Sequence, residues 1–163
     1  GKSTLAESLS SRYPCNIIHM DDFFLSPDLR TPERLALPGG NIHYERFLEE
    51  VAPCLETHSS GSYRIYSCKS GEYANAFWDG TKPLTLVEGV YSMRPELRHL
   101  YDCSLFVDVD WETQQKRLLH RGGAETLNMF QTKWIPLEEA YFSYYDIEAI
   151  CSYRIRLTDN IVL

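Results

Sequence analysis

"GKST", residues Gly1 to Thr4, is the stretch that decides the fold of this 163-residue chain. It matches the second half of the pattern G-x-x-x-x-G-K-[S/T], in which backbone N–H groups and the first turn of a helix surround phosphate oxygens. The triplet also arises by chance in roughly one unrelated chain of this length in ten, so the residues around it have to support the interpretation. A helical pattern of apolar residues follows directly and stops at Pro14, as the motif requires: Leu5, Ala6, Leu9 and Tyr13.

Phosphate binding is the chemistry that this motif indicates. Its lysine neutralises the charge of the β- and γ-phosphates, and the hydroxyl that follows ligates Mg²⁺. We therefore predict that Gly1, Lys2, Ser3 and Thr4 bind a triphosphate and that Ser3 contacts the metal. The chain starts inside the motif and without Met, so we expect the natural protein to have upstream residues, including the strand that enters the loop.

Composition and charge narrow the range of partners. With 44% apolar and 24% charged residues, the chain has the composition of one soluble domain, spanning 1–163. A formal charge of −7 argues against nucleic acid, and no apolar run reaches the ~18 residues of a membrane span. Five cysteines without a C-x-x-C pair indicate reduced thiols in a cytoplasmic protein. We expect a small-molecule substrate and no nucleic-acid or membrane partner, and we leave open that the chain forms a homo-oligomer.

Strands alternate with helices along the chain, which predicts a parallel sheet covered on both faces. The expected strands are "CNIIHM" after Pro14, a buried "PLTLVEG", "SLFVDVD" and a final "YRIRL". A hairpin-like excursion is expected at about 57–82 and an irregular segment at 26–41. Helices are expected at 44–55, 95–100, 112–121 and 137–150, with "RGG" breaking the third of them.

Two acidic positions lie where strands end. Asp21 in "DDFF" is a candidate general base that orients an acceptor hydroxyl near a γ-phosphate, and Glu88 in "LVEG" is a candidate metal-associated acid. Successive residues at a strand end point opposite ways, so we expect only one of Asp21 and Asp22 to face the site. The alternative for each acid is a solvated loop or capping position.

Arg117 and Arg121 lie four residues apart, on one face of the helix that precedes "RGG". Guanidinium groups on a mobile lid, at about 117–135, can close over a transferring phosphate and stabilise its charge. The alternative is a pair of surface arginines in solvated ion pairs.

Aromatic residues crowd the excursion at 57–82. They either stack on a base or fill a core, and packing is the more frequent use. His43 and His120 stand alone in the sequence, so by default they are surface or hydrogen-bonded residues. The aromatic positions of the excursion are Tyr63, Tyr66, Tyr73, Phe77 and Trp78.

Taken together and in order, these segments resemble the uridine kinase and nicotinamide riboside kinase group of P-loop nucleoside kinases. The segments that carry the resemblance are "GKSTL", "DDFF", "GGNIHYERF", "LVEGVY", "LRHLYDCSLFVDVD" and "RLLHR". It implies a three-layer α/β/α P-loop NTPase fold with a mainly parallel five-stranded sheet whose first strand is absent from this sequence. It also implies ATP with Mg²⁺ as donor and a ribose 5′-hydroxyl, or a similar alcohol, as acceptor.

The resemblance also implies residue roles. Asp21 matches the catalytic base, Arg117 and Arg121 match the lid pair, and Phe24 matches a residue beside the acceptor pocket. Ser3 and Glu88 match metal-associated positions, to which we add Asp21.

Two positions depart from the family. His43 stands where an Asp usually accepts hydrogen bonds from the ribose 2′- and 3′-hydroxyls, and a neutral imidazole accepts only one. Tyr66 and Ser67 replace a Tyr-Asp pair in the base-binding excursion, so the aromatic substrate-binding residue remains while the acid is absent. The donor half of the site therefore matches the family, and the acceptor half is altered.

Three functions follow as hypotheses. The leading one is an ATP-dependent kinase that transfers the γ-phosphate to a hydroxyl of a nucleoside or related alcohol. The second is a regulatory nucleotide-binding module that does not transfer phosphate, suggested by the altered acceptor positions. The third is a P-loop ATPase without a small-molecule acceptor.

Overall fold

The computed structural model describes residues 1–157, so the last six positions of the expected domain lie outside it. The chain forms two compact units: Lys2–Asp102, and Gly1 together with the segment from Cys103 onward. Each unit is described by itself below.

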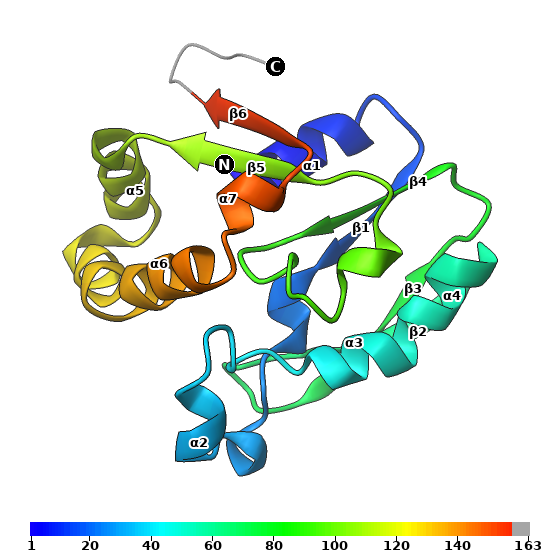
Figure 1. The fold of residues 1–163 in the computed structure, drawn as a ribbon, viewed down its shortest axis with the longest axis horizontal. Helices are drawn as coiled ribbons and strands as arrows, with labels where there is room; N and C mark the ends of the chain where they lie inside the picture. The colour runs from blue at the N-terminus through cyan, green and yellow to red at the C-terminus, as the bar shows by residue number, and fades with distance from the viewer. Residues whose placement is uncertain (158–163) are drawn as a thin grey trace. The chain divides into compact units, whose positions relative to one another are not determined.

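The first unit is built on a helix and a pair of parallel strands. Helix α1 (Lys2–Ser10) precedes strand β1 (Cys15–His19), which pairs with strand β4 (Leu84–Glu88). In this register His19 is the partner of Glu88, so both strands end at the same edge (Figure 1). The parallel pairing confirms the two strands expected from "CNIIHM" and "PLTLVEG".

Burial differs between these two strands. Cys15 and Ile18 of β1 are buried, with Ile18 only 1% exposed, whereas β4 is partly exposed along its length and Leu84 is 39% exposed. The prediction of a buried strand at "PLTLVEG" is therefore wrong for this unit. In the described residues β4 is hydrogen-bonded to β1 alone.

A close backbone approach fixes the ends of β1 and β4. β1 runs into the 3-10 turn η1 (Met20–Phe23), and Gly89 follows β4 with φ of 145°. A Cβ added to Gly89 would lie 2.6 Å from the Cβ of Met20, so only glycine fits here. The start of η1 is thereby held against the end of β4.

The irregular segment and the second helix are shorter and more broken than expected. The segment at 26–41 contains two short turns, η2 (Pro27–Leu29) and α2 (Pro32–Leu35). The expected helix at 44–55 divides into α3 (Tyr44–Glu50) and α4 (Ala52–Thr57). Pro53 explains the division, because proline lacks the N–H that a continuous helix needs and clashes with the preceding turn.

The excursion forms a hairpin, as predicted. Strands β2 (Gly61–Tyr66) and β3 (Tyr73–Trp78) pair antiparallel, and α3 and α4 lie beside them in Figure 1. The helix expected at 95–100 is only a 3-10 turn, η3 (Arg98–Leu100).

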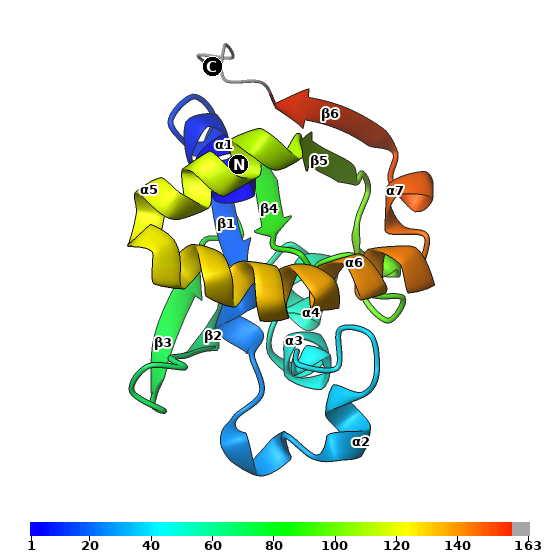
Figure 2. The same ribbon diagram turned by 90° about the vertical axis from the view of Figure 1, so that its left-hand side faces the viewer.

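The second unit pairs strand β5 (Leu105–Val109) with strand β6 (Tyr153–Leu157) in parallel (Figure 2). Asp108 stands opposite Arg156 in this register and accepts a hydrogen bond of 2.8 Å from its Nε. The helical segments between the strands are α5 (Trp111–Met129), the π-helical turn η4 (Phe130–Trp134), α6 (Ile135–Tyr144) and α7 (Ile147–Ile150).

The helices of this unit contain two breaks, of which only the first was expected. Gly122 and Gly123 have non-helical dihedral angles inside α5, with φ of 71° at Gly123, so "RGG" kinks the helix as expected. The last expected helix, 137–150, instead divides into α6 and α7, because Asp146 takes the left-handed conformation with φ of 50°.

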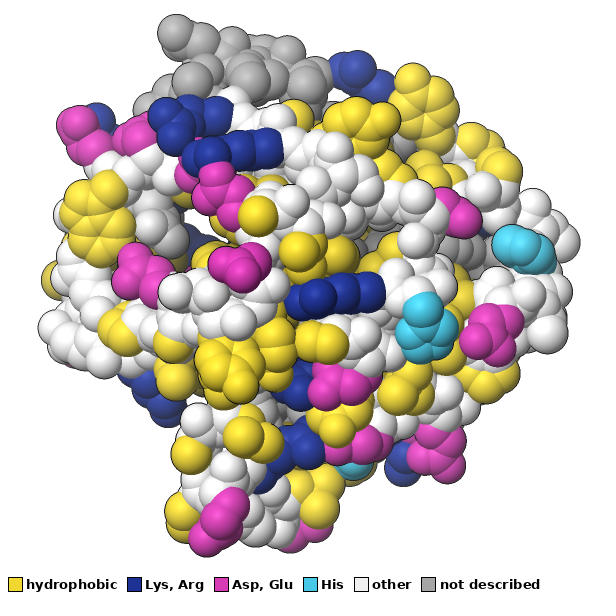
Figure 3. Space-filling model, viewed as in Figure 1, with side chains coloured by type: hydrophobic (Ala, Val, Ile, Leu, Met, Phe, Trp, Pro, Cys, Tyr) yellow, Lys and Arg dark blue, Asp and Glu magenta, His cyan; other side chains and the backbone are white. Residues whose placement is uncertain are grey.

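The fold is mixed α/β with parallel strands. In the described part of the chain, β1–β4 and β5–β6 are parallel pairs and β2–β3 is antiparallel, so a single five-stranded sheet stays a prediction. Among residues 1–157, no helix combines the length and apolar character needed to cross a bilayer. On the face in Figure 3, dark blue Lys and Arg side chains lie close to magenta Asp and Glu side chains in several places.

Candidate active site

The first turn of α1 carries the predicted triphosphate-binding residues. Lys2, Ser3 and Thr4 open the helix and are exposed. The backbone N–H groups of a first turn lack partners within the helix and carry its positive dipole end, which favours bound anions. The structure therefore presents these residues in the context that phosphate binding needs.

Ser3 meets the acid at the end of β4. Its Oγ donates a hydrogen bond of 3.0 Å to Glu88 Oε1, across 85 positions of sequence. Two of the three residues predicted to be metal-associated, Ser3 and Glu88, thus lie in direct contact, since α1 packs against β4.

His19 joins this contact and was not among the predicted site residues. Its Nδ1 lies 2.6 Å from Glu88 Oε1, the same oxygen that accepts from Ser3. The only signal in the sequence is its place as the last residue of a strand, two positions before Asp21. The site at this edge is therefore a cluster of a hydroxyl, a carboxylate and an imidazole.

Asp21 and Asp22 lie within η1, directly after the end of β1. The expectation that they point opposite ways rested on strand geometry, which does not apply in a 3-10 turn. Burial nevertheless separates them: Asp21 is exposed, whereas Asp22 is partly buried. The role of Asp21 as base stays a prediction, and the structure places it two residues after His19.

Tyr63 and Arg46 hold η1 from two other elements. The Tyr63 hydroxyl donates to Asp22 Oδ2 at 3.2 Å, and Arg46 Nη2 donates to the Asp22 carbonyl at 2.6 Å. Burial raises the pKa of Asp22, and the hydrogen bond from Tyr63 opposes this rise. The Arg46 guanidinium, which is almost fully buried, lies 4.4 Å from the centre of the Phe23 ring and pairs with Glu50. The turn that carries Asp21 is therefore braced by β2 and α3.

Replacing Tyr63 by Phe tests this bracing. We expect the free energy of unfolding to fall by about 1 kcal/mol, because one buried hydrogen bond is lost while the ring stays. Urea denaturation measures the change. Tyr73→Phe is the matched control on the same hairpin, and its exposed side chain predicts a change below about 0.5 kcal/mol. Equal losses in both variants would contradict a specific contact to Asp22.

The predicted acceptor residues Phe24 and His43 lie on two neighbouring segments that are joined by one β-bridge. Phe24 bridges to Ile42 in antiparallel fashion, and the His43 N–H donates to the Phe23 carbonyl at 2.7 Å. Asn41 and His43 flank Ile42, which is fully buried. Asn41 Nδ2 and His43 Nδ1 are buried and have no hydrogen-bond partner within residues 1–157.

A buried polar atom without a hydrogen bond lowers the stability of the folded protein. A ligand group that forms the missing hydrogen bond would therefore bind favourably here. Burial also lowers the pKa of His43, so its imidazole is neutral near pH 7. The predicted acceptor residue His43 thus presents a neutral imidazole.

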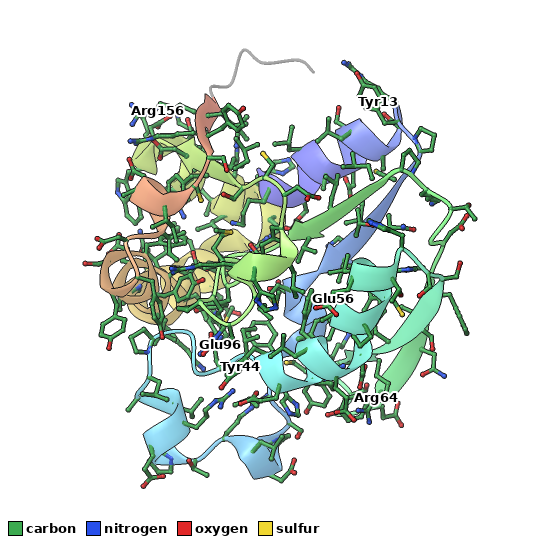
Figure 4. The ribbon with its side chains drawn as sticks, turned by 45° about the vertical axis from the view of Figure 1, so that its right-hand side comes forward. Tyr13, Tyr44, Glu56, Arg64, Glu96 and Arg156 are labelled. Carbon is green, nitrogen blue, oxygen red and sulfur yellow. The ribbon has the colours of Figure 1, made fainter. Side chains whose placement is uncertain are left out.

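Two arginines, Arg34 and Arg94, make contacts that stabilise the segment around Ile42 and His43. Arg34 forms a bidentate pair with Glu45 and donates to the Ile42 carbonyl at 2.9 Å. Arg94 pairs with Glu96, and its guanidinium lies 4.3 Å from the centre of the Tyr44 ring. Figure 4 shows Tyr44 and Glu96 near each other at this place.

Tyr66, the third predicted acceptor residue, is packed within the hairpin. It is only 4% exposed, and its ring lies 5.1 Å from that of Tyr73. Tyr73 is the more exposed ring of the two, with the guanidinium of Arg64 at 5.3 Å from its centre. Base stacking by Tyr66 stays a prediction, and the packing alternative matches its burial.

The remaining predicted residues lie in the second unit. Gly1 has Arg117 as a neighbour, since a Cβ added to Gly1 would lie 4.0 Å from Arg117 Nη1. Arg121 is exposed and its guanidinium lies 4.9 Å from the centre of the Phe130 ring. The kink at Gly122 and Gly123 follows directly, inside the expected lid at 117–135. The lid roles of both arginines stay predictions.

Comparison with known proteins identifies solved structures that share this fold. No protein-family model matches the chain, and no curated protein matches it. A solved structure of a possible uridine kinase from Bacillus stearothermophilus is 17% identical, with a TM-score of 0.70 over 95% of this chain and 82% of that one. A provisionally assigned fructose transport system kinase from a Silicibacter species is 19% identical, with a TM-score of 0.68 over 94% of this chain and 81% of that one. The chain therefore has the mixed α/β fold of these two solved structures.

Proposed function

We propose that the protein is an ATP-dependent phosphotransferase that phosphorylates a hydroxyl of a small molecule, with a nucleoside or a related alcohol as the expected class. The observation that carries this proposal is the contact between Ser3, in the first turn of α1, and Glu88, at the end of β4. This contact joins the phosphate-binding motif to an acid at the strand edge where open α/β sheets bind ligands.

The donor half consists of Gly1, Lys2, Ser3 and Thr4. Lys2 neutralises phosphate charge, and the first-turn N–H groups accommodate the phosphate oxygens. The Ser3 hydroxyl and the Glu88 carboxylate fit Mg²⁺, which prefers oxygen ligands and is usually held by one or two protein groups together with the phosphates. Asp21 is a third oxygen donor near the same edge. When bound, Mg²⁺ neutralises charge on the β- and γ-phosphates.

The acceptor half centres on Asp21, which orients the acceptor hydroxyl and takes up its proton as the new bond to phosphorus forms. Phe24, His43 and Tyr66 are the proposed binding residues for the rest of the acceptor. The buried atoms of Asn41 and His43 support a polar ligand group in this place, which a module that only binds a nucleotide would not need. Arg117 and Arg121 are proposed to stabilise the charge of the transferring phosphate.

A screen for ADP release tests the proposal. Full-length protein with Mg-ATP is offered nucleosides, nicotinamide riboside, pantothenate and simple sugars, and one acceptor is expected to raise ADP release well above the background. Release that no acceptor changes would favour an ATPase. Tight ATP binding without release would favour a regulatory module. Either outcome contradicts the proposed transfer.

His43→Asp tests the acceptor half. A carboxylate accepts several hydrogen bonds where the neutral imidazole accepts one, so we expect kcat/KM for nucleosides with a ribose cis-diol to rise about tenfold. ADP release against the same nucleosides measures the change, with His99→Asp as the control, since His99 is an exposed residue of η3. A fall in activity with every nucleoside would show that His43 does not stand at the ribose position.

A further inference from the structure

His19 and Glu88 form a contact that the proposed chemistry does not use directly. They are the last residues of β1 and β4 and are register partners, so the backbone pairing brings their side chains together. The Nδ1 to Oε1 distance is 2.6 Å, with the imidazole 43% and the carboxylate 14% exposed. A carboxylate accepts only, so the shared hydrogen lies on Nδ1 of His19.

Both hydrogen bonds to Glu88 fall on one oxygen. Ser3 Oγ donates to Oε1 from α1, and His19 Nδ1 donates to Oε1 from β1. No described residue donates to Oε2. Two donors on different elements restrict the rotation of a carboxylate, because turning it would break both bonds at once.

We propose that His19 is a positioning residue for Glu88: by donating Nδ1–H to Oε1, it holds the carboxylate against Ser3 and keeps Oε2 for the Mg²⁺ that accompanies ATP. This inference rests on the proposed function, since it gives Glu88 a purpose only where a metal-nucleotide complex binds. The positioning role of His19 requires the hydrogen bond from Nδ1 and does not require a charged imidazole. Outer partners of this kind commonly tune metal affinity by fixing the direction of the inner ligand.

A purely structural role for His19 makes a different prediction. If the His19–Glu88 hydrogen bond only stabilises the pairing of β1 with β4, its loss lowers the free energy of unfolding. If His19 positions Glu88, its loss raises the Mg²⁺ concentration that nucleotide binding requires. His19→Leu removes the donor. His19→Asn keeps one, because the Asn Nδ2 is bonded to Cγ as the His Nδ1 is, so it should restore the contact. His99→Leu is a matched control in the same unit, on η3.

The experiment has two readouts. Imidazole NMR of the ligand-free protein is expected to show a hydrogen-bonded Nδ1 proton on His19 that disappears in Glu88→Ala. Fluorescent ATP binding titrated with Mg²⁺ is expected to need roughly tenfold more Mg²⁺ in His19→Leu. The Mg²⁺ concentration that His19→Asn and His99→Leu need is expected to stay within about threefold of the wild-type value.

Three results would overturn the inference: no hydrogen-bonded proton on His19, an unchanged Mg²⁺ requirement in His19→Leu, or equal losses in His19→Leu and His19→Asn. If the unchanged protein binds no Mg-ATP at all, the proposed function itself fails. The NMR readout then still decides whether His19 holds Glu88.

Discussion

Asp21→Asn is expected to lower turnover by about 10²-fold or more while ATP binding stays nearly intact. The amide keeps the size of the side chain but cannot take up a proton, and general-base catalysis is commonly worth this factor. Turnover with the best acceptor and ATP affinity by titration are the two measurements. A split between them is expected because Asp21 lies on η1, outside the first turn of α1, which is proposed to bind the phosphates.

Asp22→Asn is the matched control for that variant, in the same turn. Its side chain still offers an acceptor to the Tyr63 hydroxyl, which now donates to Asp22 Oδ2. Its turnover is expected to fall less than about fivefold, since no proton transfer is lost. Wild-type turnover in Asp21→Asn, or a larger loss in Asp22→Asn, would show that the base was assigned to the wrong residue.

Among the residues proposed to bind ATP, Lys2 is expected to give the largest loss of kcat when it is replaced by Met. The methionine keeps much of the side-chain length but removes the positive charge, and loss of one preorganised group that stabilises transition-state charge costs about 10² to 10³ in kcat. Steady-state kinetics at saturating acceptor measures the effect, and the KM for ATP is expected to rise as well.

Lys69→Met is the control for this charge change, in the exposed turn between β2 and β3. It removes the same charge from the same unit away from α1 and is expected to leave both kinetic constants unchanged within about twofold. A loss in Lys69→Met as large as in Lys2→Met would point to a general charge effect, contrary to a specific phosphate contact.

The sequence predicted the parts of the fold that local patterns specify. Helix α1, strands β1 and β4 and the hairpin follow from apolar periodicity and turn residues, so each was found near its observed bounds. The break at Val51 was missed although Pro53 stands in the sequence, because the apolar spacing of 44–55 continues across the proline without a change. The opposed directions of Asp21 and Asp22 were expected from a strand that had already ended at His19.

The site was only partly predictable for a different reason. Ser3 and Glu88 were assigned from motif positions, and the structure brings them together. His19 was missed because its partner is 69 positions away and a histidine at a strand end carries no pattern of its own. Arg46 was missed because charged residues are rarely buried, so burial against Phe23 cannot be inferred from composition.

The destination of the γ-phosphate tests the central claim most directly. Full-length protein is incubated with Mg²⁺ and ATP labelled at the γ-phosphate, together with the acceptor that most raises ADP release. The proposed function predicts that the label appears as an organic phosphate ester on that acceptor, and that Lys2→Met slows its formation by about 10² to 10³-fold. Label recovered only as inorganic phosphate, or remaining on ATP with every acceptor, would contradict phosphate transfer by this protein.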